Sequence, residues 1–226
     1  HSAVAPAVQP PVLGAAMLLA FFLKGIVVGA VIAVPVGPVG VLCVRRTIFE
    51  GRLAGLVSGL GAATADAIFG IVAGFGLTVI ADWLLGYEDL LRVGGGCYLL
   101  YAGAAGLLAK SDEKPHEETD PEGLVRDFAS TFALCIVNPV TIVAFLGIFA
   151  ALGLSGAGAT LVRAAAMVLG VWIGSMLWWL GLSLGIGSFR RSIGPRHLRW
   201  ISRGSGAVLF LSGAALLIIA AVEHFA

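Results

Sequence analysis

The stretch Ile32–Gly40, which reads IAVPVGPVG, interrupts a long apolar run and is the feature around which the chain is best understood. Pro35 and Pro38 each remove a backbone hydrogen-bond donor, and Gly37 adds conformational freedom, so a helix must break or kink here. Broken backbone at membrane depth is tolerated only where protein or a water-filled cavity satisfies the freed polar groups. Because transporters build substrate sites from such discontinuous helices, the stretch predicts a binding site inside the molecule.

Composition identifies the class of protein. Hydrophobic residues make up 59% of the chain and charged residues only 12%, whereas a soluble domain carries roughly 25% charged residues. We therefore expect an all-α integral membrane protein in contact with lipid. The arginines are scattered over several loops rather than gathered in one patch, which argues against nucleic acid as a partner.

The sequence lacks the common short motifs of enzymes and of metal or nucleotide sites. It contains no Gly-rich phosphate loop, no HExxH, no paired CxxC and no nucleophile motif. Cys43, Cys97 and Cys135 are odd in number and far apart, which is typical of small buried hydrophobes rather than of metal ligands or disulfides. We expect no enzyme activity, no cofactor and no metal site.

Six apolar stretches are long enough to cross a bilayer, which takes about 20 residues in a helix. The stretches cover residues 14–44, 53–80, 93–109, 128–152, 160–188 and 205–222. Residues 1–13 are expected to form an extended lead-in, and the acidic stretch 110–127 a hydrophilic connector on the cytoplasmic side. This divides the chain into a first three-helix repeat at 14–109 and a second at 128–226.

Basic residues predict the orientation in the membrane. Most of the Lys and Arg residues follow the first, third and fifth spans, namely Arg45, Arg46, Arg52, Lys110, Lys114, Arg126, Arg190, Arg191, Arg196, Arg199 and Arg203. Loops rich in Lys and Arg stay on the cytoplasmic side. These three loops should therefore be cytoplasmic, with both termini outside, in the inner membrane of a bacterial cell.

A second break at Asn138-Pro139 matches the first. Three spans in each half force the halves into opposite orientations, which is the inverted-repeat arrangement of many transporters. Pro35 lies 11 residues after Lys24, and Pro139 lies 12 residues after Asp127. Both breaks are thus about 17 Å deep, near the middle of the bilayer. The sequence predicts six transmembrane helices as two inverted three-helix repeats, with the first and fourth helices broken.

Asp66 lies near the middle of the second span. An ionised carboxylate at this depth is costly, so such residues usually face an internal path and serve it. We expect Asp66 to contact a substrate or to take up a coupling proton. The structural alternative is an Asp that only hydrogen-bonds locally, for example near Thr64.

These residues resemble a known family. The motif Pro35-Val-Gly-Pro38, the Gly-rich second span with Asp66 and the later Asn138-Pro139 are similar to the signatures of LysE/RhtB-type amino-acid exporters. The resemblance extends over essentially the whole chain in span number and spacing. It implies the fold and the role of such an exporter. Family members often carry Lys or His after the Asn-Pro, and here Val140-Thr141 follows, so the exported amino acid stays open.

The breaks and Asp66 together suit an amino acid, which carries both charges. N-terminal helix ends favour a carboxylate and C-terminal ends favour an ammonium group. We expect the site to contain Asp66 and Thr64, together with residues of the two breaks: Pro35, Gly37, Pro38, Asn138, Pro139 and Thr141. Simple proline kinks are the alternative.

With no nucleotide-binding segment in the sequence, we expect a secondary exporter that works by alternating access. Protons are the simplest driving ion, and the substrate's own gradient is the alternative. The main rival function is a divalent metal-ion exporter, although such a site needs several oxygen ligands and Asp66 is the one acid deep in any span.

Small residues recur at spacings that allow close helix approach. The pairs Gly55/Gly59, Gly70/Gly74 and Gly170/Gly174 predict helix packing within the chain. The glycines of the third span, Gly94, Gly96, Gly103 and Gly106, suit either intramolecular packing or a homodimer face. Three tryptophans of the fifth span, Trp172, Trp178 and Trp179, either line the cavity or contact lipid.

Overall fold

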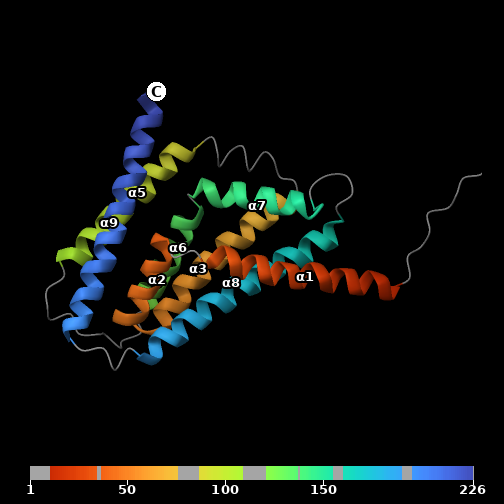
Figure 1. Cartoon of the computed structure of the whole chain (residues 1–226), viewed down its shortest axis with the longest axis horizontal. Helices are drawn as coiled ribbons and strands as arrows, with labels where there is room; N and C mark the ends of the chain where they lie inside the picture. Colours follow the sequence, from red (N-terminus) through yellow and green to blue (C-terminus); the bar gives the residue numbers. More distant parts are fainter. Residues whose placement is uncertain are drawn as a thin grey trace, which may run out of the picture.

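The computed structural model describes residues 11–34, 37–75, 87–108, 121–136, 138–154, 160–189 and 195–225, and every regular element within these ranges is a helix. Figure 1 labels them α1 (Pro11–Ala33), α2 (Pro38–Phe49), α3 (Arg52–Gly74), α5 (Glu88–Leu108), α6 (Pro121–Ile136), α7 (Pro139–Ala151), α8 (Leu161–Phe189) and α9 (Pro195–Phe225). Four segments are long and apolar enough to cross a membrane, namely Gly14–Ala33, Arg52–Gly74, Leu161–Phe189 and His197–Val222. The chain is therefore an all-α, multi-pass membrane protein.

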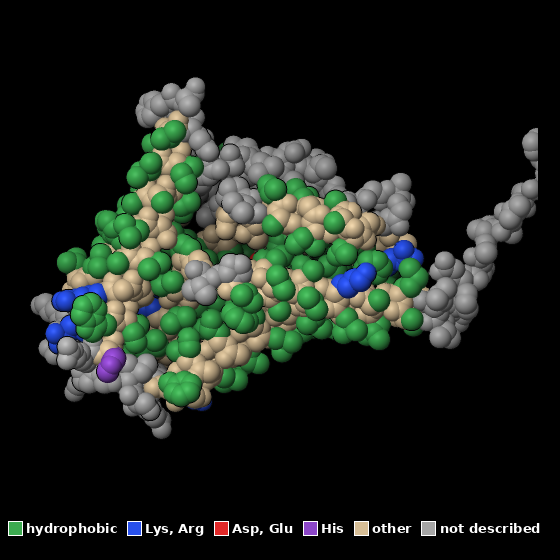
Figure 2. All heavy atoms as spheres, in the orientation of Figure 1, with side chains coloured by type: hydrophobic (Ala, Val, Ile, Leu, Met, Phe, Trp, Pro, Cys, Tyr) green, Lys and Arg blue, Asp and Glu red, His purple; other side chains and the backbone are tan. Residues whose placement is uncertain are grey.

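Large and small side chains lie on different faces of the apolar helix α1. Leu19, Leu23 and Val27 recur every four residues and are all more than half exposed, so they form one face of the helix. Gly25 and Gly29 lie on the face that meets α8. Large side chains are thus turned to lipid and small ones to protein. Figure 2 shows hydrophobic side chains spread along the described helices, with Lys and Arg in only a few places.

Glycines bring α1 and α8 into backbone contact. A Cβ atom at Gly174 would collide with the carbonyl oxygen of Ile26, and one at Gly29 with that of Val171. Such close approach strengthens van der Waals contact in a membrane, where the hydrophobic effect does not drive helices together. The predicted packing role of the pair Gly170/Gly174 is confirmed.

Glycines of α5 do the same against α9. Cβ atoms at Gly96, Gly103 and Gly106 would meet α9 at Leu217, Phe210 and Gly206 respectively. Of the two roles that the sequence allowed for these glycines, these three have intramolecular packing. A homodimer stays a prediction.

Both predicted helix breaks coincide with helix ends. The first separates α1, which ends at Ala33, from α2, which begins at Pro38, and the second separates α6 from α7, which begins at Pro139. Gly37 caps α2 in an extended conformation, with φ −87° and ψ −169°, and proline follows at the first helical position. Proline is favoured there because its missing N–H group would have no intrahelical partner in any case. Pro35 lies outside the described residues.

The basic turn after the first span begins later than predicted. Helix α2 continues to Phe49, so Arg45 and Arg46 are helical rather than part of a loop. The chain reverses at Gly51, whose φ of 109° suits glycine and is costly for other residues. The prediction ended the span at its first charge, whereas Arg46 is buried and has protein partners.

Other helices begin before their predicted starts. Helix α1 begins at Pro11, within the expected lead-in, and α5 begins at Glu88. Helix α6 begins at Pro121, so the last residues of the expected connector are helical. Residues 110–120 of that connector lie outside the described part of the chain.

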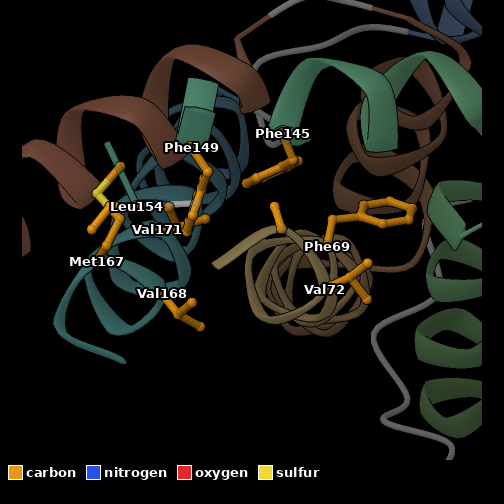
Figure 3. Packing of buried hydrophobic residues seen from close by; sticks show 9 residues of the cluster. Phe69, Val72, Phe145, Phe149, Leu154, Met167, Val168 and Val171 are labelled. Atoms are coloured by element: carbon orange, nitrogen blue, oxygen red, sulfur yellow. The ribbon is translucent and has the colours of Figure 1, made fainter. Parts of the chain in front are cut away.

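A core of aromatic and aliphatic side chains joins α3, α7 and α8. Phe69 of α3 contacts Phe145 of α7 with 6.1 Å between ring centroids, and Phe145 contacts Phe149 at 6.2 Å. Val168 and Val171 of α8 belong to the same cluster. Figure 3 shows the side chains of this cluster on the three helices. Phe69 comes one turn after Asp66, so this core lies next to that aspartate along α3.

Candidate functional site

A pocket of about 430 Å³ lies where the two helix breaks meet α3 and α8. Pockets for small molecules have volumes of about 300–1,000 Å³. Six helices (α1, α2, α3, α6, α7 and α8) and both breaks contribute its lining residues, which are Val31, Ile32, Ala33, Gly37, Pro38, Val39, Gly40, Ala62, Asp66, Cys135, Asn138, Thr141, Ala144 and Trp179. Most of these residues are apolar, and the few polar side chains among them therefore determine which ligand groups can be held.

Asp66 is the acid among the described lining residues. Its side chain is 6% exposed, and Ser175 Oγ of α8 donates a hydrogen bond of 2.8 Å to Asp66 Oδ2. Within the described residues Asp66 Oδ1 has no hydrogen bond. A carboxylate can accept about four hydrogen bonds, so most of this capacity stays available on the side of the pocket.

Helix ends surround this carboxylate. The N-terminal turn of α2 lines the pocket at Gly37–Gly40, and the N-terminal turn of α7 lines it at Thr141. The last turn of α1, at Val31–Ala33, and Cys135 of α6 supply helix C-termini. N-terminal N–H groups attract anions and C-terminal carbonyl groups attract cations, so the pocket offers both kinds of partner.

Two backbone hydrogen bonds, each between residues three positions apart, stabilise the second break. Asn138 N–H donates to the carbonyl oxygen of Cys135, and Thr141 N–H donates to that of Asn138, both at 3.1 Å. Helix α7 thus starts in a tight turn directly beside the pocket. Asn138 and Thr141 therefore line the same pocket as Asp66.

The structure brings most of the predicted site residues together. Gly37, Pro38, Asp66, Asn138 and Thr141 all line the pocket. Pro139 is the first residue of α7, but its side chain lies outside the described part, as does the whole of Pro35.

Thr64 and two of the tryptophans lie elsewhere. Thr64 Oγ1 donates to the carbonyl oxygen of Leu60, one turn earlier in α3, and Thr64 is not a lining residue. Of the three tryptophans of α8, Trp179 lines the pocket, whereas Trp172 and Trp178 pack around the cluster that contains it.

Ser175 is the site residue that sequence reasoning missed. It is fully buried, and its partner Asp66 is 109 residues away in the sequence. A signal was present, because a buried carboxylate needs a donor and the fifth span contains serines, Ser175 among them. The spacing could not identify which serine would serve.

Comparison with known proteins identifies the family of this chain. The sequence model of the LysE type translocator family matches residues 30–219, which include both helix breaks and every lining residue of the pocket. The chain belongs to the LysE type translocator family. It is a transporter and not an enzyme.

Members of this family from several bacteria align over most of the chain. The candidate amino acid efflux protein YcgF of Bacillus subtilis strain 168 is 28% identical over 85% of this chain and 92% of its own length. The arginine exporter protein ArgO of Salmonella typhi is 27% identical over 74% of this chain and 78% of its own length. The uncharacterized membrane protein YahN of Escherichia coli K12 is 28% identical over 74% of this chain. No solved structure shows a significant match.

Proposed function

We propose that this LysE-type translocator is a secondary transporter that exports a zwitterionic amino acid from the cytoplasm by alternating access and that protons drive it. The observation that carries the proposal is a pocket that places one buried carboxylate between two interrupted helices. Asp66 would pair with the α-ammonium group. The N-termini of α2 and α7 would hold the α-carboxylate.

The lining favours a substrate with an apolar side chain. Ile32, Ala62, Ala144 and Trp179 surround the space beside Asp66. The second positive charge of arginine would need a second negatively charged partner. Among the described lining residues, Asp66 is the acid. We therefore propose a neutral, apolar amino acid, although ArgO is named for arginine export.

Proton coupling is proposed at the same carboxylate. Asp66 keeps free acceptor capacity inside a mostly apolar pocket, so a proton and an ammonium group can compete for it. Such competition couples the two movements, because release of one cargo permits uptake of the other.

The membrane arrangement belongs to the same proposal. Six spans, with α1–α2 and α6–α7 each counted as one interrupted span, form two inverted repeats at residues 14–109 and 128–226. The loops after the first, third and fifth spans face the cytoplasm of a bacterial cell, and both termini lie outside. Alternating access then consists of a movement of one repeat against the other around the pocket.

Divalent metal ions are the alternative cargo, and the pocket favours amino acids over them. Hard cations take six or more oxygen ligands, several of them carboxylates. In the described part of the chain, no three His, Cys, Asp or Glu residues lie close enough together to hold a metal ion.

Export from proteoliposomes tests the proposal. Vesicles loaded with radiolabelled leucine, arginine or no amino acid would be compared with and without a proton gradient, for the wild type, Asp66→Asn and the control Glu122→Gln. Glu122 is an exposed acid at the start of α6, outside the pocket.

We expect gradient-driven leucine efflux in the wild type and the control, weak arginine efflux, and loss of both in Asp66→Asn. Equal leucine efflux with and without the gradient would show that transport is not coupled to protons. Equal efflux in wild type and Asp66→Asn would make Asp66 a structural residue. If no amino acid moved, Mn²⁺ and other divalent cations would be tested next.

A further inference from the structure

A second buried polar cluster lies outside the pocket, around Arg46 of α2. The side chain of Arg46 is about 6% exposed, and Arg46 Nε pairs with Asp127 Oδ1 at 3.0 Å. The guanidinium also donates five hydrogen bonds of 2.7–3.1 Å, to Ser58 Oγ, Thr131 Oγ1, Tyr98 OH, Ser130 Oγ and the carbonyl oxygen of Asp127. We refer to these six residues as the Arg46 network.

The Arg46 network joins helices from both halves of the chain. It ties Arg46 of α2 and Ser58 of α3 to Tyr98 of α5 and to the α6 residues Asp127 and Thr131. A guanidinium has five N–H donors, and six acceptors surround this one. No donor is left for a substrate, so the network acts as a clamp rather than as a binding site.

The network lies at one end of the pocket. Arg46 is eight residues beyond Pro38 in α2, and Ser58 is eight residues before Asp66 in α3, which corresponds to about 12 Å along each helix. Thr131 is seven residues before Asn138, about 10 Å along α6. Three helices therefore place the network at the same depth, between the pocket and the end of the molecule that carries the turn at Gly51.

A different kind of packing follows Asp66 in the other direction along α3. The aromatic core of Phe69, Phe145 and Phe149 begins there, one turn beyond Asp66, and Figure 3 shows its side chains. An apolar layer separates by sliding or by exposing hydrocarbon. A polar layer can exchange each internal hydrogen bond for one to water. A buried ion pair also contributes little net stability, because the cost of removing the charges from water offsets their attraction. The Arg46 network is thus suited to open and close.

We infer that Arg46 and Asp127 form a gate that seals the pocket on the cytoplasmic side. The pair is closed in this structure and must part before a cytoplasmic solute reaches Asp66. The direction of this gate rests on the proposed function and on the proposed topology, in which the turn at Gly51 is cytoplasmic. The existence of the gate rests on the contacts alone.

Cys135 provides a natural reporter for the gate. It lines the pocket and is partly exposed, whereas Cys43 is buried and Cys97 lies on the surface of α5. In a Cys43→Ser, Cys97→Ser background, the membrane-impermeant thiol reagent sulfonatoethyl methanethiosulfonate would be added to right-side-out or inside-out vesicles. Ser188→Cys serves as a side marker, because Ser188 is exposed and hydrogen-bonded to Arg52 at the turn end.

We expect slow modification of Cys135 from the marker's side while the pair is intact. Asp127→Asn and Arg46→Gln should each accelerate it about tenfold or more from that side only, because each shifts the population toward the open gate. Arg45→Gln is the matched control, since Arg45 precedes Arg46 in the same helix and is not part of the network. The double exchange Arg46→Asp with Asp127→Arg should restore slow modification.

Unchanged rates in both variants would overturn the gate and leave a structural clamp. Faster modification from both sides would also overturn it, because this indicates general loosening. Transport distinguishes the gate from the proposed function. Side-specific acceleration without any amino acid flux would uphold the gate and refute the exporter, whereas flux with unchanged labelling would do the reverse.

A cross-link avoids variants that remove a buried charge. Ser58 Oγ and Thr131 Oγ1 both bond to Arg46 Nη1, so cysteines at these positions come close when the gate is closed. Oxidation of Ser58→Cys/Thr131→Cys in the same background should stop Cys135 labelling from the marker's side, and reduction should restore it. An unchanged rate of Cys135 labelling after oxidation would refute the gate.

Discussion

Two buried aspartates of this protein have opposite surroundings. Asp127 is 2% exposed and faces the guanidinium of Arg46 at 3.0 Å, whereas Asp66 is 6% exposed and has one neutral donor, Ser175, at 2.8 Å. The first charge is compensated inside the protein. The second lines a pocket with acceptor capacity to spare. Burial alone therefore does not identify a transport residue, whereas the partners of the buried group do.

The largest effect on stability is expected at the compensated pair. Arg46→Ala leaves the carboxylate of Asp127 buried without its partner, which should lower the free energy of unfolding by about 3–5 kcal/mol. Unfolding of the purified protein in detergent, followed by far-UV circular dichroism against denaturant, measures this change. A loss below about 1 kcal/mol would mean that water replaces the guanidinium and that the pair is not a buried unit.

Asp66→Asn should impair transport and leave the stability of the protein nearly unchanged. The amide keeps an oxygen that accepts from Ser175 and removes a charge from an apolar site, so we expect the unfolding free energy to stay within about 1 kcal/mol of the wild type. Amino acid flux should nevertheless fall to the level of empty vesicles. If flux and stability fell together, Asp66 would resemble Asp127, and its role would be structural.

Ser175→Ala should have an intermediate effect on transport. Without the 2.8 Å hydrogen bond, Asp66 loses the contact that fixes the direction of its carboxylate, which is worth about 1 kcal/mol or roughly a fivefold loss of flux. Ser175→Thr keeps the hydroxyl and is the matched control. A positioning role predicts that the pH dependence of flux shifts in the alanine variant and not in the threonine variant. An identical pH profile in all three proteins would argue against it.

The smallest effect is expected for Ser130→Ala. Arg46 Nη2 would keep Tyr98 as an acceptor, and the carbonyl oxygen of Arg126, to which Ser130 also donates, is near the surface. The unfolding free energy should fall by about 0.5–1 kcal/mol. Thr131→Ala, which removes a fully buried acceptor from Nη1, should cost more in the same assay. The reverse order would mean that the Arg46 network is stabilised at its rim rather than at its centre.

Local chemistry explains which features could be predicted. Pro38 and Gly37 interrupt the first span wherever it is placed, because a missing donor and a missing Cβ act on their own backbone. Asn138-Pro139 acts in the same way, and the structure ends and begins helices at both places. Asp66 was identifiable because a carboxylate in an apolar span is costly in any fold. Thr64 was included for its closeness in sequence, yet its hydroxyl satisfies its own helix at Leu60.

Residue types and their spacing are enough to predict a multi-pass, all-α membrane protein in which two spans are interrupted and a different span carries the buried carboxylate of Asp66. They also identify the LysE-type pattern that the family comparison bears out. Which side chains become partners depends on how the helices pack in the folded protein. Ser175 reaches Asp66 across 109 residues, and Asp127 pairs with an arginine that the sequence had assigned to a loop. The physical reason is that breaks arise from bonds within one segment, whereas the cost of a buried charge is met by whichever group the folded chain brings beside it.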